Sequence, residues 1–393
     1  MPMRIIQIGL LRSFFLGCDS FTSSSSIGIS ITRHLQTAAV MQAAKSSLAA
    51  ASSSKSDLPP SAPQFVVSRN GVKLPWQNIN RYEEDGEDPS PSDSDSDTPM
   101  SAATLLQVLP RGAYTTCRTI DHGRRIYLFD FHVDRMDDSA RSIFDDDFDR
   151  SHAEAWCRDS IMNCVRTTIL DFCETYRVEA GSADFRIVLL ATLEENRLSG
   201  GGESKEGVLY CHVGELSTRS DTENIRVLIH GHGRENAEAK DSKWILDRKR
   251  LITPESASYE EIIMLSEDGE LLEGTQTNFY VVREDALITA DEGILLGSVR
   301  DSVLRVCRSH SVNVELRPPT MDDLKHASGV FISSTSRLVM PVHNVVLGDL
   351  VQGDTDTSGE RATSYHYKNC RMTDRIKEWV LRDVETHSTS VET

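Results

Sequence analysis

A β-favouring run that follows a carboxylate constrains this sequence more than any other feature. Residues 272–282 read LEGTQTNFYVV, so Glu273 precedes a small polar tetrapeptide, and Asn278 opens an apolar run of aromatic and β-branched residues. Such a run predicts a buried strand. A carboxylate at the mouth of a buried strand costs free energy unless a cation or a hydrogen-bond donor meets it. Glu273 is therefore a candidate functional residue, although many Glu-Gly pairs simply end surface loops.

This stretch resembles the signature of the class IV pyridoxal-phosphate aminotransferases, the family of branched-chain and D-amino acid aminotransferases and of aminodeoxychorismate lyase. Three further regions resemble that family in the same order along the chain. They read FHVDRM around Arg135, AEAKDSKWILDRKR at 237–250, and GILLGSVR with FISSTSRLVMPV at 293–300 and 331–342. The resemblance covers about residues 105–345. It implies the α/β (α+β), two-domain fold of the family, here behind a disordered N-terminal leader.

The resemblance implies that the chain binds pyridoxal 5′-phosphate covalently. It places the Schiff base on Lys243, which lies 30 positions before Glu273; Lys240, at 33 positions, is the other candidate. The Asp241-Ser242-Lys243 context matches the family pattern better. Glu273 then pairs with the pyridine nitrogen of the cofactor. A lysine buried beside a cationic group has a lowered pKa, as this chemistry needs.

The same resemblance assigns the cofactor phosphate and the substrate. Asn278 shapes the strand and loop beside Glu273. Gly297 precedes a helical pattern, and the free N–H groups of a helix N-terminus favour an anion. Family members often have Thr at the position of Val299, so we expect weaker phosphate binding. Many also have Glu at the position of Leu338. The phosphate residues are Arg135, Ser298, Val299, Thr335 and Ser336, and the substrate residues are Tyr114 and Arg337.

The function implied by the resemblance is transamination between an amino acid and a 2-oxo acid, both small molecules. Two alternatives stay open. A lyase of the aminodeoxychorismate lyase type would use the same cofactor without an amino acceptor. A non-catalytic descendant of the fold would serve as a binding or assembly module, consistent with the departures at Val299 and Leu338. Family active sites commonly lie beside a partner subunit, so we expect a homodimer.

Charge and cysteine spacing exclude several other functions. The net charge of −18 over 393 residues argues against binding nucleic acid or an anionic membrane as the main activity. No run approaches the ~20 apolar residues of a transmembrane helix. The eight cysteines form no CxxC motif and no metal-ligand spacing, so they indicate free thiols in a reducing compartment. His230 and His232 have no third ligand spaced nearby, and we expect no metal site.

The N-terminal hundred residues differ from the rest. Residues 1–60 are rich in Ser and Ala and hold five basic against two acidic residues, a composition typical of an organellar transit peptide. We favour the mitochondrion over the plastid, with a cytoplasmic location as the fallback. Residues 61–101 are expected to be a linker, with eight acids between Glu83 and Asp97. We therefore expect a chain that begins near Ser101 to fold and to bind cofactor.

Periodicity divides the remaining chain. We expect a smaller domain at 102–236, a larger cofactor-binding domain at 237–350, and a tail at 351–393 with a terminal helix at 372–384. Apolar residues at helical spacing predict one long amphipathic helix from His152 to Tyr176. Strands are predicted at 65–67, 113–118, 125–131, 185–193, 208–213, 225–230 and 259–265.

Overall fold

The computed structural model describes residues 64–74, 101–179, 181–197, 203–216, 224–254, 256–348, 364–368 and 370–391. All of them lie in one compact unit, Pro63–Thr393. The expected transit peptide and the acidic run at 83–97 lie outside the described residues. Within the described ranges, no helix is long and apolar enough to cross a membrane, and no three potential metal ligands gather.

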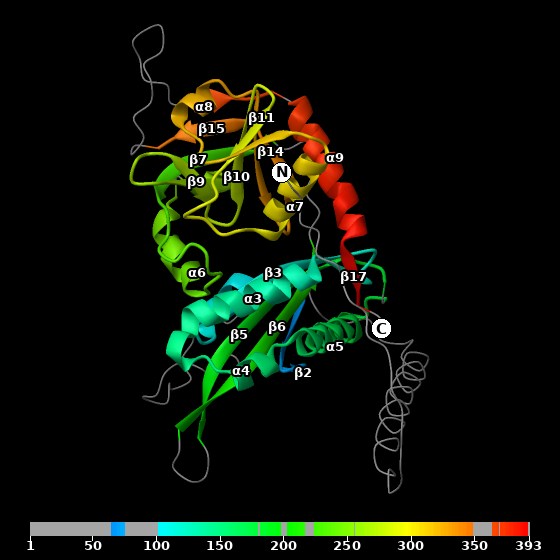
Figure 1. The fold of residues 1–393 in the computed structure, drawn as a ribbon. Coiled ribbons are helices and arrows are strands. Elements are labelled where there is room, and N and C mark those ends of the chain that lie inside the picture. The colour runs from blue at the N-terminus through cyan, green and yellow to red at the C-terminus, as the bar shows by residue number, and fades with distance from the viewer. Residues whose placement is uncertain are drawn as a thin grey trace, which may run out of the picture. The chain divides into compact units, whose positions relative to one another are not determined.

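Seven strands form the first sheet, in the order β17-β4-β3-β5-β6-β1-β2 (Figure 1). All neighbouring strands in it are antiparallel. Side chains alternate between its two faces, as the two-residue period of a strand requires. On β5, for example, Ile187 and Leu189 enter one hydrophobic core and Val188 and Leu190 enter another. The strands are β1 Phe65–Arg69, β2 Val72–Lys73, β3 Gly112–Ile120, β4 Arg125–Tyr127, β5 Phe185–Arg197, β6 Glu203–Glu215 and β17 Ser388–Ser390.

Helices cover both faces of the first sheet. α3 (Phe129–Phe144), α4 (Arg150–Ala155) and α5 (Arg158–Tyr176) pack on one face, with the short helix η2 (Asp145–Asp147) between α3 and α4. α2 (Ala102–Val108) packs on the other face. The single long helix predicted from His152 is in fact interrupted. Asp149 caps α4, which ends at Ala155, and Cys157 adopts an extended conformation just before α5 begins at Arg158.

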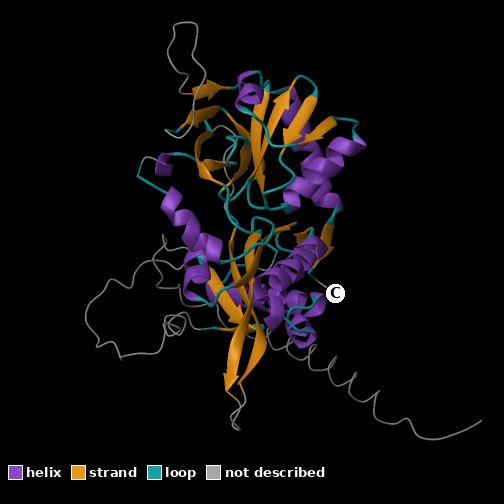
Figure 2. Ribbon diagram, turned by 60° about the vertical axis from the view of Figure 1, so that its left-hand side comes forward, coloured by secondary structure: helices purple, strands orange, loops and turns teal. Residues whose placement is uncertain are grey.

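The second sheet has ten strands, in the order β12-β11-β10-β9-β8-β7-β15-β16, with β13 paired to β10 and β14 paired to β13. Figure 2 shows the strands of both sheets flanked by helices. The strands are β7 Arg226–His232, β8 Glu261–Leu265, β9 Leu271–Gly274, β10 Asn278–Arg283, β11 Ala286–Thr289, β12 Asn313–Leu316, β13 Gly329–Ser334, β14 Leu338–Val342, β15 Asn344–Leu347 and β16 Ser364–His366. The helices are α6 Lys243–Asp247, η3 Arg248–Leu251, η4 Ser256–Ser258, α7 Ser298–Ser309, α8 Met321–Lys325 and α9 Arg371–Thr386.

The predicted strand at 278–282 lies at the centre of the second sheet. Tyr280 and Val282 pack with α7 and α9 on one side, and Phe279 and Val281 pack with β7 and β8 on the other. All four side chains are fully buried. Burial on both faces explains why this stretch is apolar at every position rather than at alternate ones.

The observed arrangement confirms the expected α/β fold and the expected terminal helix, α9, and shows that the strands form two sheets. The chain passes from the first sheet to the second between Glu215 and Arg226, whereas we expected the domain boundary after residue 236. After α9 the chain returns to the first sheet, where β17 pairs with β4 (Figure 1). The strand predicted to run to residue 131 ends at Tyr127, because Leu128 takes a left-handed conformation and α3 begins at Phe129.

β1 lies within the segment that we expected to be a linker. It pairs with β6 over five residues, and Val66 and Val67 are 4% and 2% exposed. The Tyr176 hydroxyl also bonds both main-chain polar groups of Phe65. Burying two valines stabilises a fold by about 3–6 kcal/mol at most. The expectation that everything before Ser101 is dispensable therefore disagrees with the structure.

We predict that a chain beginning at Pro63 keeps the urea unfolding midpoint of the full chain, because it retains β1. A chain beginning at Ser101 should lose about 3 kcal/mol or more in free energy of unfolding, because the core beneath β1 becomes exposed. Urea titrations followed by circular dichroism measure both. Equal midpoints for the two shortened chains would show that β1 contributes nothing to the fold.

Candidate active site

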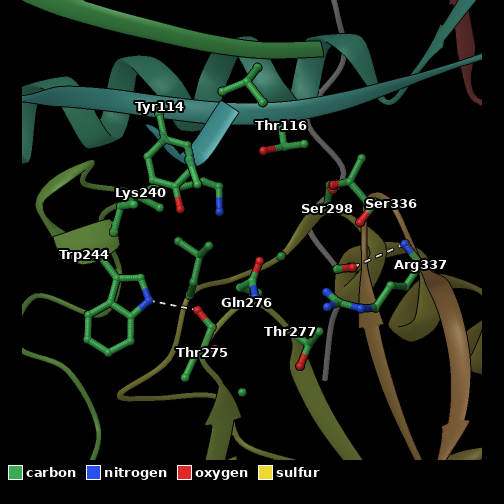
Figure 3. Close-up of a pocket in the computed structure, with 18 of the residues that line it drawn as sticks. Tyr114, Thr116, Lys240, Trp244, Thr275, Gln276, Thr277, Ser298, Ser336 and Arg337 are labelled. Atoms are coloured by element: carbon green, nitrogen blue, oxygen red, sulfur yellow. Dashed lines mark hydrogen bonds between the residues drawn. The ribbon is translucent and has the colours of Figure 1, made fainter. Parts of the chain in front are cut away.

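A cavity of about 230 Å³ lies between the two sheets. Tyr114 and Thr116 of β3 line it from the first sheet, and Glu273 of β9 lines it from the second. Lys240 enters from the segment between β7 and α6, and Trp244 from α6 itself (Figure 3). The cavity therefore gathers polar groups that are more than 150 positions apart in the sequence.

The main chain of Lys240 is held against the first sheet. The Tyr114 N–H donates to the Lys240 carbonyl (2.9 Å), and the Lys240 N–H donates to Ser139 Oγ of α3 (3.0 Å). The next residue, Asp241, forms an antiparallel bridge with Ala113 and an ion pair with Arg111 (2.6 Å). Because this segment runs alongside β3 as a strand would, the direction of each of its side chains is fixed.

The Lys240 amine lies 4.5 Å from the centre of the Tyr114 ring, inside the cavity. Burial, and after it the guanidinium groups of Arg135 and Arg234, lower the pKa of Lys240 well below its ordinary value. A charged amine there loses hydration and meets like charges, so the neutral form is favoured. A neutral amine is the form that can attack a carbonyl carbon.

Lys243, the residue predicted to be the reactive lysine, does not line the cavity. Its side chain is 55% exposed, and its amine pairs with Asp247 of the same helix at 3.4 Å. The physical reason is the path of the chain: residues 240–242 run along β3, and α6 begins at Lys243 and turns that side chain away. The geometry favours Lys240, the candidate that the sequence context ranked second.

Glu273 lies where the sequence predicted, at the end of β9 and 4% exposed. Arg234 Nε donates to one of its carboxylate oxygens, and the Leu295 N–H donates to the other, each at 3.1 Å. Burial raises the pKa of this carboxyl to about 7, and Arg234 opposes that rise. Glu273 is thus poised to accept a hydrogen bond from a cationic group.

Arg234 was not identified from the sequence. Besides pairing with Glu273, it donates to the carbonyls of Ala237 and Ala239, which lie three positions and one position before Lys240. Its side chain is 7% exposed and lies 5.5 Å from the centre of the Trp244 ring. The guanidinium therefore joins the predicted carboxylate to the loop that carries the lysine. A buried carboxylate needs a cation beside it, and that need is the signal by which Arg234 could have been identified from the sequence.

Arg135, the residue predicted to reach the cofactor phosphate, lines the cavity, and its surroundings suit an incoming anion. One terminal nitrogen donates to Thr115 Oγ1 (2.7 Å), which is also hydrogen-bonded to His132 Nδ1 (2.8 Å). Arg135 Nε is buried and has no hydrogen-bond partner among the described residues. Burial lowers the pKa of Arg135 to about 10. An anion would supply both the missing hydrogen bond and the compensating charge.

The N-terminus of α7 is a second group in the same cavity that suits an anion. Ser298 and Val299 are the first residues of this helix, and both line the cavity. Asn278 donates to the Leu295 carbonyl (2.7 Å), and its Oδ1 lies 2.2 Å from where a Cβ of Gly297 would be. Glycine is therefore required at the helix start, and Asn278 shapes the loop as the resemblance implied. Free N–H groups at this helix end attract an anion.

The turn between β13 and β14 completes the cavity. Thr335 and Ser336 line it, and Thr335 Oγ1 lies 3.1 Å from Ser298 Oγ. Arg337 also lines it (Figure 3). Its guanidinium pairs with Glu260 at 2.7 Å, so its charge is already compensated. Leu338, the residue that departs from the family pattern, adopts a left-handed conformation with φ of 53°.

A buried carboxylate holds the loop between Glu273 and Asn278. Glu261 accepts hydrogen bonds from the N–H and hydroxyl of Thr275 and from the Gln276 N–H. The Trp244 indole donates to the Thr275 carbonyl at 2.9 Å (Figure 3). The predictions included neither Glu261 nor Trp244. They contribute by fixing the wall of the cavity, which depends on contacts distant in sequence.

Comparisons with known proteins agree with this geometry. Residues 112–345 match the amino-transferase class IV family. A D-alanine aminotransferase of Bacillus licheniformis is 36% identical over 93 residues, which is 23% of this chain and 32% of that protein. The matched segment thus spans about a third of this relative.

Solved structures match over much more of the chain. A branched-chain aminotransferase of Thermoproteus uzoniensis crystallised with norvaline covers 83% of this chain and 99% of its own, with a TM-score of 0.58 and 17% identity. The holo form of a branched-chain amino acid aminotransferase of Thermobaculum terrenum covers 84% and 99%, with a TM-score of 0.56 and 17% identity. At such identities these likenesses concern the fold. Because the family match spans more than half of the sequence, this chain belongs to the class IV aminotransferases.

Proposed function

We propose that this chain is a pyridoxal 5′-phosphate-dependent transaminase that moves an amino group between an amino acid and a 2-oxo acid. The observation that carries the proposal is the constellation in the cavity. A lysine with a lowered pKa, Lys240, and a buried carboxylate, Glu273, share that cavity with an anion site. The named relatives, a D-alanine and two branched-chain aminotransferases, support the same class of reaction.

The residues present fit this cofactor. Its phosphate dianion matches the unsatisfied Nε of Arg135, the N-terminus of α7 and the Thr335 hydroxyl. Its ring nitrogen, which carries a proton when the ring is active, matches the Glu273 carboxylate. Its aldehyde matches the Lys240 amine. When bound, pyridoxal phosphate supplies a carbonyl that takes up the amino group and a ring that withdraws electrons from the substrate Cα.

Lys240 would have two tasks. Its amine would hold the cofactor covalently, and when free it would take the proton from the substrate Cα and later return one. Both tasks need a neutral amine, which burial and the neighbouring guanidinium groups provide. The hydrogen bonds from Tyr114 and to Ser139 hold the lysine main chain, so that only the flexible side chain has to move.

Glu273 would keep the proton on the ring nitrogen. A carboxylate beside a cation has its charged form favoured, so the cofactor should reverse the effect of burial on this residue. Arg234 and the Leu295 N–H hold the two carboxylate oxygens in place. The presence of both Lys240 and Glu273 argues against a non-catalytic role. The departures from the family pattern at Val299 and Leu338 affect neither residue.

Homodimeric assembly and an organellar location stay predictions. The first comes from the resemblance to the family. The second comes from the composition of residues 1–60, which lie outside the described residues.

We predict that Lys240→Ala abolishes the visible absorbance of covalently bound cofactor and lowers turnover by about 10²–10⁴-fold or more, because both the attachment point and the proton carrier are lost. Lys243→Ala is the matched control and should change neither quantity by more than about twofold, since that side chain lies outside the cavity. Absorption spectra and stopped-flow half-reactions measure both variants. A Lys240→Ala protein that keeps its absorbance would refute the assignment.

The raised pKa of Glu273 predicts how stability depends on pH in the cofactor-free protein. Between pH 4.5, the usual pKa of a glutamate side chain, and about pH 7, the folded protein holds a proton on Glu273 that the unfolded chain has lost. Rising pH therefore destabilises the fold across this window, by up to about 3 kcal/mol. Glu273→Gln has no such proton, so its stability relative to the wild type should grow from pH 4.5 to 7 and then level off.

Urea titrations at several pH values measure this difference. Glu267→Gln, at an exposed position in the turn before β9, is the control and should give a difference that does not change with pH. A flat difference for Glu273→Gln as well, or one of opposite sign, would show that burial does not raise the pKa of Glu273.

A further inference from the structure

A histidine outside the cavity is linked to Arg135 by a chain of hydrogen bonds. His132 of α3 is 1% exposed and does not line the cavity, whereas Arg135, three positions later on the same helix, does. Side chains three positions apart on a helix lie next to each other. These two meet at Thr115 of β3, whose hydroxyl oxygen lies 2.8 Å from His132 Nδ1 and 2.7 Å from a terminal nitrogen of Arg135. The three groups therefore form one cluster beside the cavity.

The partners of His132 determine which of its ring nitrogens carries the proton. The terminal nitrogen of Arg135 that bonds Thr115 also lies 3.3 Å from His132 Nδ1. A guanidinium group only donates hydrogen bonds, so this contact is favourable only if Nδ1 is the unprotonated nitrogen. Thr115 then accepts from Arg135 and donates its own hydroxyl proton to Nδ1. His132 is therefore neutral, with its proton on Nε2.

The other surroundings of His132 favour the same state. Its Nε2 is buried and has no hydrogen-bond partner among the described residues. Burial, and after it Arg135 and Lys240, lower the pKa of His132 well below its ordinary value. A charged ring would also turn Nδ1 into a donor that faces the guanidinium group. His132 thus stays an acceptor near neutral pH.

The chain of hydrogen bonds holds one end of the Arg135 side chain. Thr115 and His132 contact one terminal nitrogen, and Nε stays buried without a hydrogen-bond partner in the described part of the chain. Holding a long side chain in one orientation costs conformational entropy, and a bound anion would otherwise have to offset that cost. A guanidinium group that is already held in place therefore binds an anion more tightly than a free one.

We infer that His132 is a positioning residue for the phosphate of the cofactor: through Thr115 it holds the Arg135 guanidinium in the orientation that binds an anion. Because His132 does not line the cavity, it acts without touching the cofactor. This inference rests on the proposed function and extends it to a residue behind the site. It also states what position 132 requires, which is an uncharged hydrogen-bond acceptor at the place of Nδ1.

Pyridoxal 5′-phosphate and pyridoxal test this role on the cofactor-free full chain, because they differ only in the phosphate group. The ratio of their dissociation constants, measured by absorption titration, reports on the phosphate contacts alone. His132→Leu removes the acceptor and should reduce the preference for pyridoxal phosphate by about 10–100-fold, the effect of one hydrogen bond to a charged group. The affinity for pyridoxal should stay within about twofold, because the contacts of Lys240 and Glu273 do not include this chain.

Two further variants test the chain of hydrogen bonds itself. His132→Asn should keep the preference within about threefold of the wild type, because an amide oxygen can accept hydrogen bonds at the place of Nδ1. Thr115→Val breaks the chain at its centre and should lower the preference as His132→Leu does. The double variant, Thr115→Val with His132→Leu, should lose much less than the sum of the two single effects, because both changes remove the same link.

His152→Leu is the matched control. His152 is another buried histidine, but it lies on α4 and does not line the cavity or contact Arg135. Its loss should leave the preference for pyridoxal phosphate unchanged, which separates the role of His132 from the general cost of removing a buried histidine.

The results separate this inference from the function on which it rests. Three outcomes overturn the role of His132: an unchanged preference in His132→Leu, an equal loss of affinity for both compounds, or a loss in His132→Asn as large as that in His132→Leu. Each leaves the transaminase proposal standing, provided that the wild type shows the visible absorbance of bound cofactor. Thr115→Val replaces His132→Leu in this comparison if the leucine variant does not fold. A wild type that takes up neither compound overturns both.

Discussion

The site depends on the hydrogen bonds that hold the main chain of Lys240 against β3. Tyr114 and Ser139 belong to the first sheet and its helix, whereas Glu273 belongs to the second sheet. The lysine and the carboxylate thus have separate supports, and the cavity exists because the two sheets bring them together. Arg234 joins these supports, since it contacts both Glu273 and the carbonyls that precede Lys240. A shift of either sheet would change the position of one group relative to the other.

Desolvation makes this arrangement reactive. The same burial lowers the pKa of Lys240 and raises that of Glu273, so both groups move toward their neutral forms before any ligand binds. Unpaired buried charges cost several kcal/mol. The guanidinium groups of Arg135 and Arg234 add repulsion to a charged Lys240. Anionic ligands relieve both costs. The fold therefore stores part of the free energy that favours an anionic cofactor and anionic substrates.

Local patterns predicted the central strand and its flanking residues well. Glu273 and Asn278 are opposite each other across a tight hairpin, so a short stretch of sequence determines their relation. The helix after Gly297 and the terminal helix follow from periodicity over ten or more residues. Features that depend on distant contacts were missed. The strand at 65–67 was predicted, but its pairing with β6 far along the chain was not. Arg234 and Glu261 acquire their roles only through the loops that they hold.

The choice between Lys240 and Lys243 shows the same limit. Counting positions back from Glu273 cannot reveal where an extended segment ends and a helix starts, and that change of conformation decides which side chain enters the cavity. The bridge between Asp241 and Ala113 determines where the extended segment ends. This bridge joins residues more than a hundred positions apart, so the sequence around the lysines does not reveal it.

Reductive trapping tests the central claim most directly. The full chain loaded with pyridoxal phosphate is reduced with borohydride, digested and mapped by mass spectrometry. A phosphopyridoxyl label on Lys240 is the predicted result. A label on Lys243, or on no lysine, would contradict the account.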